Sequence, residues 1–537
     1  MKGIKIYIRI ITATLFMFAA ISCAKNETSP EIPDIATIKL SASINSEEDG
    51  LLVWDRNDAI GVINNNKLYK FVISNYDANS SEVTFSVDKS ALPGGYMEGD
   101  FNPQWPIKAF YPYDKITYDP ATSTINYTIP AEQVMSYTSI AKGTMPMAAY
   151  ATSSEEKLIF NNIFGILKLK LVGNEGENVK NIEISSSSII NGKATISINA
   201  IHENTPEVSI YISKEESSYN TDNKKITLVC GNGGEPLSST PTDFIAVLPA
   251  GAQNLSILIH TSTASYHISQ EAYNTNREEE FAIIAGNICE IPELNINEMM
   301  YAYIENGLYL GDGIKLPKSS DGTEYLIWAP VNCGYEAEEK DGYMTTYKGY
   351  PFGKLYQWGR KDGQGYEDNS YRDETYPSQT DILESNSPHP EKFYSNWKIS
   401  SNIWPSDSDP CPEGWRVPTI EELTSLMKDM YPGDYVTEVA SQWKVSNDDK
   451  NSRHYRLPGY IFYGNTASTE SQIFFPATGC RKADTGVSEV RGFNGCYWSS
   501  TANGDGNAWF INFNHRGYIE SYFSSQALGR AVRCVKK

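Results

Sequence analysis

The segment 495–513, GCYWSSTANGDGNAWFINF, combines residue types that could hold a cation with rings that could pack or stack. Asn503, Asp505 and Asn507 alternate with glycines, and oxygen ligands at alternate positions of a tight loop suit Ca²⁺. An EF-hand loop beginning at Asn503 would need a Glu at its twelfth position, where the chain has Asn514. The alternative is a β-turn between two strands, CYWSS and AWFINF. We favour the turn, keep calcium as the alternative, and expect no other cofactor.

Motifs of catalysis are scarce in the chain. Its six histidines show no metal-ligand spacing, and we find no nucleophile elbow, P-loop or dinucleotide-binding glycine motif. The paired carboxylates of a glycosidase need no motif, and nothing positive indicates them. The sequence therefore predicts a binding protein and no enzyme.

The charge of the chain restricts its partners. It carries 66 acidic and 45 basic residues, a formal net charge of −21. Such a chain repels nucleic acid and anionic lipid headgroups, so neither is an expected partner. Its 35 tyrosines and 10 tryptophans favour folded, β-rich domains over a disordered polymer.

The N-terminus has the pattern of an export signal. MKGIKIYIRI supplies basic residues, a short apolar run follows, and AISC ends at Cys23. The small residues before Cys23 resemble a lipobox, which implies that residues 1–22 are a lipoprotein signal peptide and Cys23 the lipidated (palmitate-bearing) first residue. Residues 23–35 are polar and predict a tether. The expected location is the cell outer membrane, surface-exposed, or a pilus; an ordinary secretory signal with an incidental cysteine is the alternative.

Residues 36–293 predict many short strands. Runs such as IATIKLSASI, SEVTFSV, ILKLKLV, KITLV and LSILIH alternate or are β-branched, and turn formers separate them. No helical period of useful length appears. We expect two β-sandwich domains, at 36–160 and 161–293.

Ordered motifs in this half resemble the fimbrillin family of Bacteroides-type pilus subunits and accessory lipoproteins. They are WDRNDAIGV, AFYPYD, IPAEQ, MPMAAY, FNNIFGILKLKL and FIAVLPAGAQNLSILI. The resemblance implies transthyretin-like β-sandwiches whose subunits join by donor-strand exchange, a form of β-augmentation. Trp54, Tyr111 and Tyr113 of these motifs are expected to be core residues. The family often frees its strand groove by cleavage after a basic residue, for which Arg56 is the candidate here, since Lys39 lies within a strand.

Residues 294–537 change character and become rich in Trp, Gly and Tyr. The ordered motifs GKLYQWGRKDG, DPCPEGWRVPTIEELTSLM, FFPATGCR and ALGRAVRCV resemble the Fibrobacter succinogenes major paralogous domain. That resemblance implies an α+β, C-type-lectin-like fold in which Trp415, Trp498 and Trp509 are core residues. One helix is predicted over TIEELTSLMKDMY, with Thr419 as N-cap and Glu422 as its capping-box partner.

The lectin-like resemblance also implies a disulfide framework. It pairs Cys411 with Cys534 and Cys480 with Cys496, and leaves Cys333 over or as a replacement partner. Four cysteines allow three pairings, so the sequence alone does not choose. Cys230 and Cys289 are a further candidate pair in the second β domain.

These parts together predict a cell-adhesion protein. A lipid-anchored chain with a folded C-terminal head would accept a donor strand and donate none, which suits a pilus tip or accessory subunit. Its partners would be other fimbrillin subunits and a glycan or host surface protein; it would meet the membrane only through its lipid anchor. The alternatives are a non-polymerising surface glycan-binding lipoprotein and, less favoured, an enzyme of the lectin-like fold.

Overall fold

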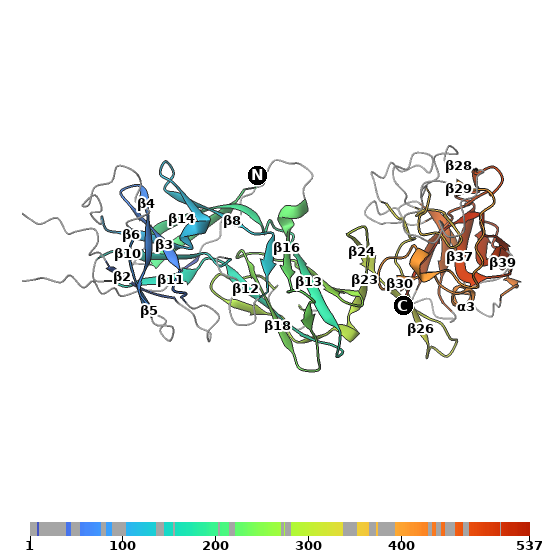
Figure 1. Ribbon diagram of the computed structural model, residues 1–537, viewed down its shortest axis with the longest axis horizontal. Helices are drawn as coiled ribbons and strands as arrows, with labels where there is room; N and C mark the ends of the chain where they lie inside the picture. Colours follow the sequence, from blue (N-terminus) through green and yellow to red (C-terminus); the bar gives the residue numbers. More distant parts are fainter. Residues whose placement is uncertain are drawn as a thin grey trace, which may run out of the picture. The chain divides into compact units, whose positions relative to one another are not determined.

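The protein is mainly β, as the sequence predicts, and its contacts divide it into two compact units (Figure 1). Unit 1 comprises Met1–Ser262 and Tyr266–Met299, and unit 2 comprises Thr263–Ser265 and Met300–Lys537. The computed structural model describes residues 8–9, 39–44, 54–76, 82–88, 104–135, 144–153, 156–201, 205–213, 221–269, 273, 281–336, 352–364, 372–373, 393–427, 432–436, 442–445, 457–464, 472–504 and 506–537.

A closed barrel forms the first part of unit 1. Its strand order is β10-β11-β2-β5-β4-β3-β6, and β6 pairs with β10 to close it. The sequence predicts a β-sandwich here. The sheet closes into a barrel because β6 pairs with both β3 and β10, and β11 pairs with both β10 and β2. The strands are β2 (Lys39–Ile44), β3 (Ala59–Asn64), β4 (Lys67–Asn75), β5 (Glu82–Val87), β6 (Ile107–Tyr111), β10 (Met147–Ala151) and β11 (Leu158–Asn162).

Three of the fimbrillin-like motifs, those that contain Trp54, Tyr111 and Phe160, meet inside this barrel. The Trp54 ring packs edge-on against Phe85, Tyr111 and Phe160 at centroid distances of 5.2, 5.6 and 5.4 Å. The Tyr111 hydroxyl donates to Asp58 Oδ1 at 3.1 Å. Both aromatic residues are buried, as predicted, whereas Tyr113 is only half-buried. The motifs are therefore explained by packing.

A second sheet of unit 1 has the order β1-β15-β14-β8-β7. Its strands are β1 (Ile8–Arg9), β7 (Ile116–Asp119), β8 (Thr124–Ile129), β14 (Gly192–Ile201) and β15 (Thr205–Ile212), and the 3₁₀ turn η3 (Tyr113–Lys115) precedes β7. It joins strands from both sides of residue 160, because β8 pairs with β14.

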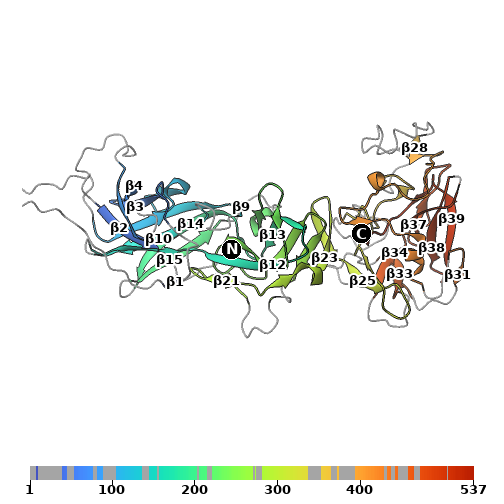
Figure 2. The same cartoon turned by 60° about the horizontal axis from the view of Figure 1, so that its bottom comes forward.

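Two further sheets complete unit 1 and lie against each other (Figure 2). One contains β12 (Gly165–Val172), β18 (Thr242–Leu248), β21 (Ile288–Glu290) and β22 (Leu294–Asn295). The other belongs to a larger sheet, of which the strands β20-β19-β13-β16-β9 follow one another in this order, with β17 (Glu235–Pro236) beside β13; these strands are β9 (Glu132–Val134), β13 (Asn178–Ser185), β16 (Lys225–Val229), β19 (Ser256–Thr261) and β20 (Ser265–Ile268). The 3₁₀ turns η4 (Thr221–Lys224) and η5 (Ile296–Glu298) flank them.

Gln133 ties these two sheets together. It lies on β9, yet its amide donates to the Val247 carbonyl at 2.7 Å and accepts from the Val247 N–H at 2.9 Å, on β18 of the facing sheet. A buried side-chain amide paired at both ends loses no hydrogen bond on burial. Because β9 comes before residue 160 and pairs with β16 after it, strand pairing crosses the predicted domain boundary, which stays a prediction.

Unit 2 contains several small sheets. Their orders are β23-β24, β25-β26-β41-β30, β27-β40-β35-β36, β28-β29, β31-β39-β38-β37 and β32-β33-β34. The strands are β23 (Met300–Glu305), β24 (Leu308–Asp312), β25 (Ile314–Pro317), β26 (Tyr325–Trp328), β27 (Tyr356–Gln357), β28 (Arg372–Asp373), β29 (Phe393–Tyr394), β30 (Trp415–Arg416), β31 (Tyr435–Val436), β32 (Gln442–Val445), β33 (Pro458–Phe462), β34 (Ile473–Pro476), β35 (Cys480–Arg481), β36 (Ser488–Glu489), β37 (Asn494–Ala502), β38 (Asn507–Asn514), β39 (Ile519–Ser525), β40 (Gly529–Arg530) and β41 (Val535–Lys536).

The β37–β38–β39 sheet has a hydrophobic cluster on each face. Trp498 and Phe510 belong to the first cluster, with Trp358, Trp397, Trp404 and Trp415. Tyr497 and Ile511, which point to the opposite face, belong to the second cluster, with Phe475, Phe513 and Leu423. This sheet is therefore buried on both faces along most of its length.

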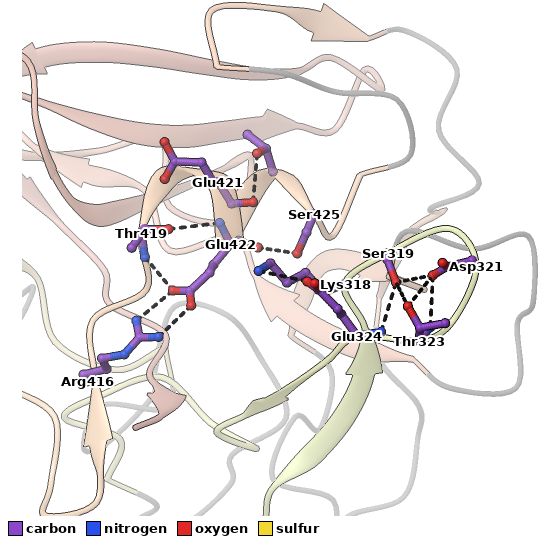
Figure 3. A network of polar contacts seen from close by, with 11 residues as sticks. Lys318, Ser319, Asp321, Thr323, Glu324, Arg416, Thr419, Glu421, Glu422 and Ser425 are labelled. Atoms are coloured by element: carbon purple, nitrogen blue, oxygen red, sulfur yellow. Dashed lines mark hydrogen bonds and ion pairs between the residues drawn. The ribbon is translucent and has the colours of Figure 1, made fainter.

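The predicted helix exists but is short. α3 spans Ile420–Thr424, after the 3₁₀ turn η6 (Ser406–Ser408). The predicted capping box is confirmed: Thr419 Oγ1 accepts from the Glu422 N–H at 3.2 Å, and Glu422 Oε2 accepts from the Thr419 N–H at 2.8 Å (Figure 3). Arg416 donates to both Glu422 oxygens, at 2.7 and 2.6 Å. The helix start is thereby fixed to the end of β30.

Candidate functional site

The segment 495–513 forms the β37–β38 hairpin, as the turn interpretation predicts. Its turn is closed by the Asn503 N–H donating to the Asn507 carbonyl and the Asn507 N–H donating to the Gly504 carbonyl, both at 2.9 Å. Gly504 and Gly506 have positive φ values of 64° and 76°, which suit glycine. Asp505 lies outside the described residues. Among the described residues, no group of three His, Cys, Asp or Glu side chains could hold a metal ion.

The turn is anchored to the end of β39. The Gln526 N–H donates to the Gly506 carbonyl at 2.8 Å, and the buried Gln526 side chain accepts from the Ile399 N–H at 2.8 Å. These bonds hold the turn against the chain that leaves β39. The ends of β38 and β39 next to the turn are consequently held in fixed positions relative to each other.

Three rings at this end of the sheet reach solvent, and we call them the aromatic platform: Trp509, Tyr522 and Phe523. Trp509 and Phe523 are cross-strand partners whose rings meet edge-on at 5.4 Å. Tyr522 stacks on Phe523, with centroids 5.0 Å apart and an interplanar angle of 13°. Tyr522 is 53% exposed and Phe523 36% exposed, and Trp509 is half-buried. The expectation that Trp509 is a core residue needs correction, because it only partly packs on the second cluster.

The platform is exposed because the sheet extends beyond its neighbours. β31 pairs with β39 only at Glu520 and Ile519, so in the described residues the second half of β39 has β38 on one side only. Ser525 is exposed and Asn507 is half-buried beside the rings. Flat rings bordered by hydroxyl and amide groups can stack on an apolar ring face and hydrogen bond to polar substituents.

No sequence pattern marks Tyr522 or Phe523 as exposed. Strand alternation places Phe523 on the same face as buried Ile519, which would predict burial. Phe523 is exposed because β31, the strand beside β39, pairs with β39 only at Ile519 and Glu520 among the described residues and does not reach Phe523. Trp415 and Trp498, in contrast, are core residues as predicted, at 2% and 0% exposure.

The predicted cysteine pairs have different outcomes. Cys411 and Cys534 form a disulfide, with a Cα–Cα distance of 5.9 Å. Cys333 is a buried thiol beside it: its Sγ donates to the Pro410 carbonyl at 3.1 Å, and burial, with the nearby Glu305 charge, raises its pKa. The leftover position expected for Cys333 is what the structure shows.

Cys230 and Cys289 are not joined in the structure, because they belong to different sheets. Cys230 comes directly after β16, and its Sγ contacts Met135 Sδ at 3.9 Å. Cys289 lies on β21, and its Sγ donates to the Ala282 carbonyl at 3.6 Å. Cys480 and Cys496 are adjacent thiols that hydrogen bond to each other. Their predicted disulfide stays a prediction.

The processing and lipidation candidates lie in the N-terminal part. Arg56 is exposed in a turn that the Asp58 N–H closes by donating to the Asp55 carbonyl. Cleavage after Arg56 would detach Trp54 together with β2, so it would remove a core ring of the barrel. Cys23, the tether and the signal peptide lie outside the described residues, apart from Ile8–Arg9 in β1.

One polar loop near α3 is well organised. The Asp321 carboxylate accepts from the Ser319 hydroxyl at 2.6 Å and from the Thr323 N–H at 3.0 Å (Figure 3). These hydrogen bonds lower the pKa of Asp321 to about 2. Because the Asp321 carboxylate accepts its hydrogen bonds from residues of the same loop, the loop is a stabilised turn.

No helix of the described residues is long and apolar enough to cross a bilayer.

Residues 299–536 match the family model described as the Fibrobacter succinogenes major domain. This confirms the resemblance of the C-terminal half to that family. The C-type-lectin-like fold that the resemblance implies stays a prediction. A search of the curated proteins finds no match to the chain.

Solved structures with some likeness include proteins from Bacteroides and Porphyromonas. A candidate cell adhesion protein from Bacteroides uniformis is 13% identical, covers 49% of this chain and 95% of its own, and has a TM-score of 0.27. A fimbrial protein from Bacteroides ovatus is 11% identical, covers 92% and 98%, and has a TM-score of 0.21. The tip fimbrial protein Mfa3 from Porphyromonas gingivalis is 11% identical, covers 46% and 92%, and has a TM-score of 0.21. At these scores the likeness supports no argument about function.

Proposed function

We propose that this protein is a cell-surface adhesin whose C-terminal unit, with a lectin-like fold, binds a glycan on the aromatic platform. The observation that carries the proposal is the exposed, stacked arrangement of Trp509, Tyr522 and Phe523. Exposed clusters of large rings are uncommon on a protein that has no partner. Rings present a flat apolar face with little loss of side-chain entropy on binding.

The surroundings of the platform favour a sugar over a charged ligand. Asn507, Ser524 and Ser525 lie next to the rings in the register of β38 and β39, and they supply amide and hydroxyl groups. The Arg530 guanidinium is buried and donates to Ser524 Oγ at 2.9 Å. A neutral sugar would use the rings for its apolar face and these polar groups for its hydroxyls.

We further propose that the protein assembles with other subunits by strand addition, which strand pairing in unit 1 supports. β1 lies at the sheet edge and pairs with β15, Ile8 opposite Val208 and Arg9 opposite Glu207. If residues 1–22 are removed as a signal peptide, the β15 edge loses this strand and could accept one from a neighbouring subunit. Val535–Lys536 is held between β26 and β30, so this segment is not available as a donor strand. These pairings suit a tip or accessory subunit, anchored through lipidated Cys23 before assembly.

One observation favours a second candidate. The barrel is closed with β2 in place, so it offers no open groove among the described strands. A surface glycan-binding lipoprotein that never polymerises would have this arrangement. A synthetic strand peptide that binds the mature chain, or copurification with a pilus, would favour assembly; failure of both would favour the second candidate.

The first experiment is a glycan array with residues 24–537, in calcium and in chelator, followed by Tyr522→Ala and Trp509→Ala. We expect each substitution to weaken binding of any glycan hit at least tenfold, about 1.4 kcal/mol, because each removes a stacking face. Tyr325→Ala is the matched control, since Tyr325 is 48% exposed elsewhere in unit 2. Equal affinity of all variants would contradict the platform. Binding lost in chelator would restore the calcium interpretation of Asn503, Asp505 and Asn507.

A further inference from the structure

Three strands converge on a pair of thiols and a buried cation in unit 2. Arg481 on β35 pairs with Gly529 on β40, in antiparallel register, which places Cys480 opposite Arg530. Tyr497 on β37 forms a parallel bridge to Ala531, which places Cys496 beside Arg530 as well. The register alone therefore brings Cys480, Cys496 and Arg530 together.

Glycines allow this close approach. Gly479 and Gly495 form a parallel bridge directly before the two cysteines. A Cβ on Gly495 would lie 1.9 Å from the Phe513 ring, and a Cβ on Gly479 would lie 2.3 Å from the Glu489 carbonyl. Because neither position has room for a side chain, the two backbones approach closely at the glycines, and the cysteines that follow them lie close together.

Arg530 is buried with incomplete hydrogen bonding. Its guanidinium lies 3.4 Å from the centroid of Phe510 and 4.9 Å from that of Trp498, and one nitrogen donates to Ser524 Oγ. It also hydrogen bonds to Cys496. Its buried Nε has no hydrogen-bond partner among the described residues. A buried cation is stabilised by an anion beside it, which a thiolate would supply on the side of the two cysteines and a disulfide would not.

We propose that Cys480 and Cys496 are a redox-active pair in which Arg530 stabilises the reduced form through a Cys480 thiolate, so that their disulfide is easily reduced. Cys480 is the half-exposed partner and Cys496 is buried, which assigns attack on external reagents to Cys480. An anionic sulfur beside a buried guanidinium lowers the free energy of the dithiol state relative to the disulfide. This inference does not depend on the proposed adhesin role.

The charges around the pair agree with this assignment. The pKa of Cys480 is lowered to about 6, first by its hydrogen bond with Cys496, which outweighs the effect of burial, and then by the Arg530 charge. The negative charge of Glu489 raises this pKa, and the positive charge of Lys482 lowers it further. The pKa of Cys496 is raised by its hydrogen bond to Cys480 and by burial. Glu489 is itself paired with Lys482 at 2.7 Å. Glu520, which also faces Arg530, accepts from Asn512 at 3.0 Å.

Oxidation then follows a balanced thiol–disulfide exchange. The Cys480 thiolate attacks a small-molecule disulfide, forming a mixed disulfide and releasing one small thiolate. Cys496 loses its proton and attacks the Cys480 sulfur, which forms the Cys480–Cys496 bond and releases the second thiolate. The protein is oxidised by two electrons and the small disulfide is reduced to two thiols.

The test equilibrates residues 24–537 in glutathione redox buffers and measures the Cys480–Cys496 disulfide by peptide mass spectrometry. We expect half-oxidation within the range of glutathione buffers, where structural disulfides stay fully oxidised. The Cys411–Cys534 bond in the same sample is the internal control. Arg530→Met should shift half-oxidation towards more reducing buffers, and Arg360→Met, another buried arginine over rings, should not.

A second readout covers the case in which Arg530→Met does not fold. The rate of Cys480 alkylation is followed against pH by mass spectrometry, and its midpoint is compared between the wild type and Cys496→Ala, which removes the hydrogen-bond donor at this position. We expect a midpoint well below that of an ordinary thiol, near 8.5, and a higher midpoint in the variant. The midpoint is preferred to the rate itself, because a less acidic thiolate is the stronger nucleophile. A Cys480–Cys496 disulfide that resists all glutathione buffers, or an ordinary wild-type midpoint, would overturn the proposal.

Discussion

Arg533 shows at the scale of a single residue how unit 2 uses a buried charge. The side chain is fully buried, and its nitrogens donate to Asn332 Oδ1 at 2.7 Å and to the Ala329 and Phe474 carbonyls at 3.0 Å. The guanidinium also lies 4.6 Å from the Phe475 centroid. It therefore joins two separate segments of the chain, residues 329–332 and 474–475, to the chain just before β41.

We expect Arg533→Met to lower the free energy of unfolding of unit 2 by about 3 kcal/mol or more, because it leaves buried acceptors unpaired. Urea denaturation followed by tryptophan fluorescence measures this. Arg516→Met removes an exposed arginine and should change stability by no more than about 0.5 kcal/mol. Similar effects of the two substitutions would show that Arg533 is not a structural tie.

At the scale of the element, the start of α3 depends on an ion pair as well as on its cap. Burial raises the pKa of Glu422, but the Arg416 hydrogen bonds and the Thr419 N–H outweigh it, so the pKa is lowered. A carboxyl whose pKa is lower in the folded state contributes stability above its unfolded pKa and loses it as the pH falls. The contribution of Glu422 should therefore disappear in acid.

We expect Glu422→Gln to cost roughly 1–2 kcal/mol at pH 7, since it weakens both the cap and the Arg416 pair. The cost should shrink as the pH falls below the ordinary glutamate pKa of about 4.3, because the unfolded chain then takes up a proton that the folded wild type still resists. Glu421→Gln, at the exposed neighbouring position, is the control. Urea titrations at pH 7 and pH 3 compare the three proteins. A cost for Glu422→Gln that is unchanged at pH 3 would contradict the ion-pair account.

At the scale of the whole molecule, the two units have different stabilising devices. Unit 1 relies on strand closure and on ties such as Gln133 between facing sheets. Unit 2 contains the Cys411–Cys534 disulfide, which spans a sequence separation of 123 residues. A cross-link over a long loop restricts the unfolded chain strongly in the chain-entropy model.

Replacing both Cys411 and Cys534 by alanine should therefore destabilise unit 2 by about 4–5 kcal/mol on that model. Calorimetry of residues 24–537 should show one transition shifted to lower temperature and the unit 1 transition unchanged. The double substitution is preferred to a reducing agent, which would also act on Cys480 and Cys496. An unshifted thermogram would show that the disulfide adds little, and a shift of every transition would show that the units unfold together.

Several features of this protein were determined by the sequence alone. Period-2 runs and turn formers predict a mainly β chain, because side chains alternate across a strand. Thr419 and Glu422 predict the helix start, because the capping box is a contact between residues three apart. The alternation of Asn and Gly at 503–507 predicts the hairpin turn for the same reason. All of these depend on neighbours in sequence.

Only the tertiary structure decided the features that depend on distant segments. Closure of the barrel needs β6 and β10, which are adjacent in space and separated in sequence. The exposure of Trp509 and Phe523 depends on where β31 ends beside β39, which strand alternation cannot report. The meeting of Cys480, Cys496 and Arg530 depends on the register of three strands. Long-range pairing sets these positions, and no local pattern of residue types encodes it.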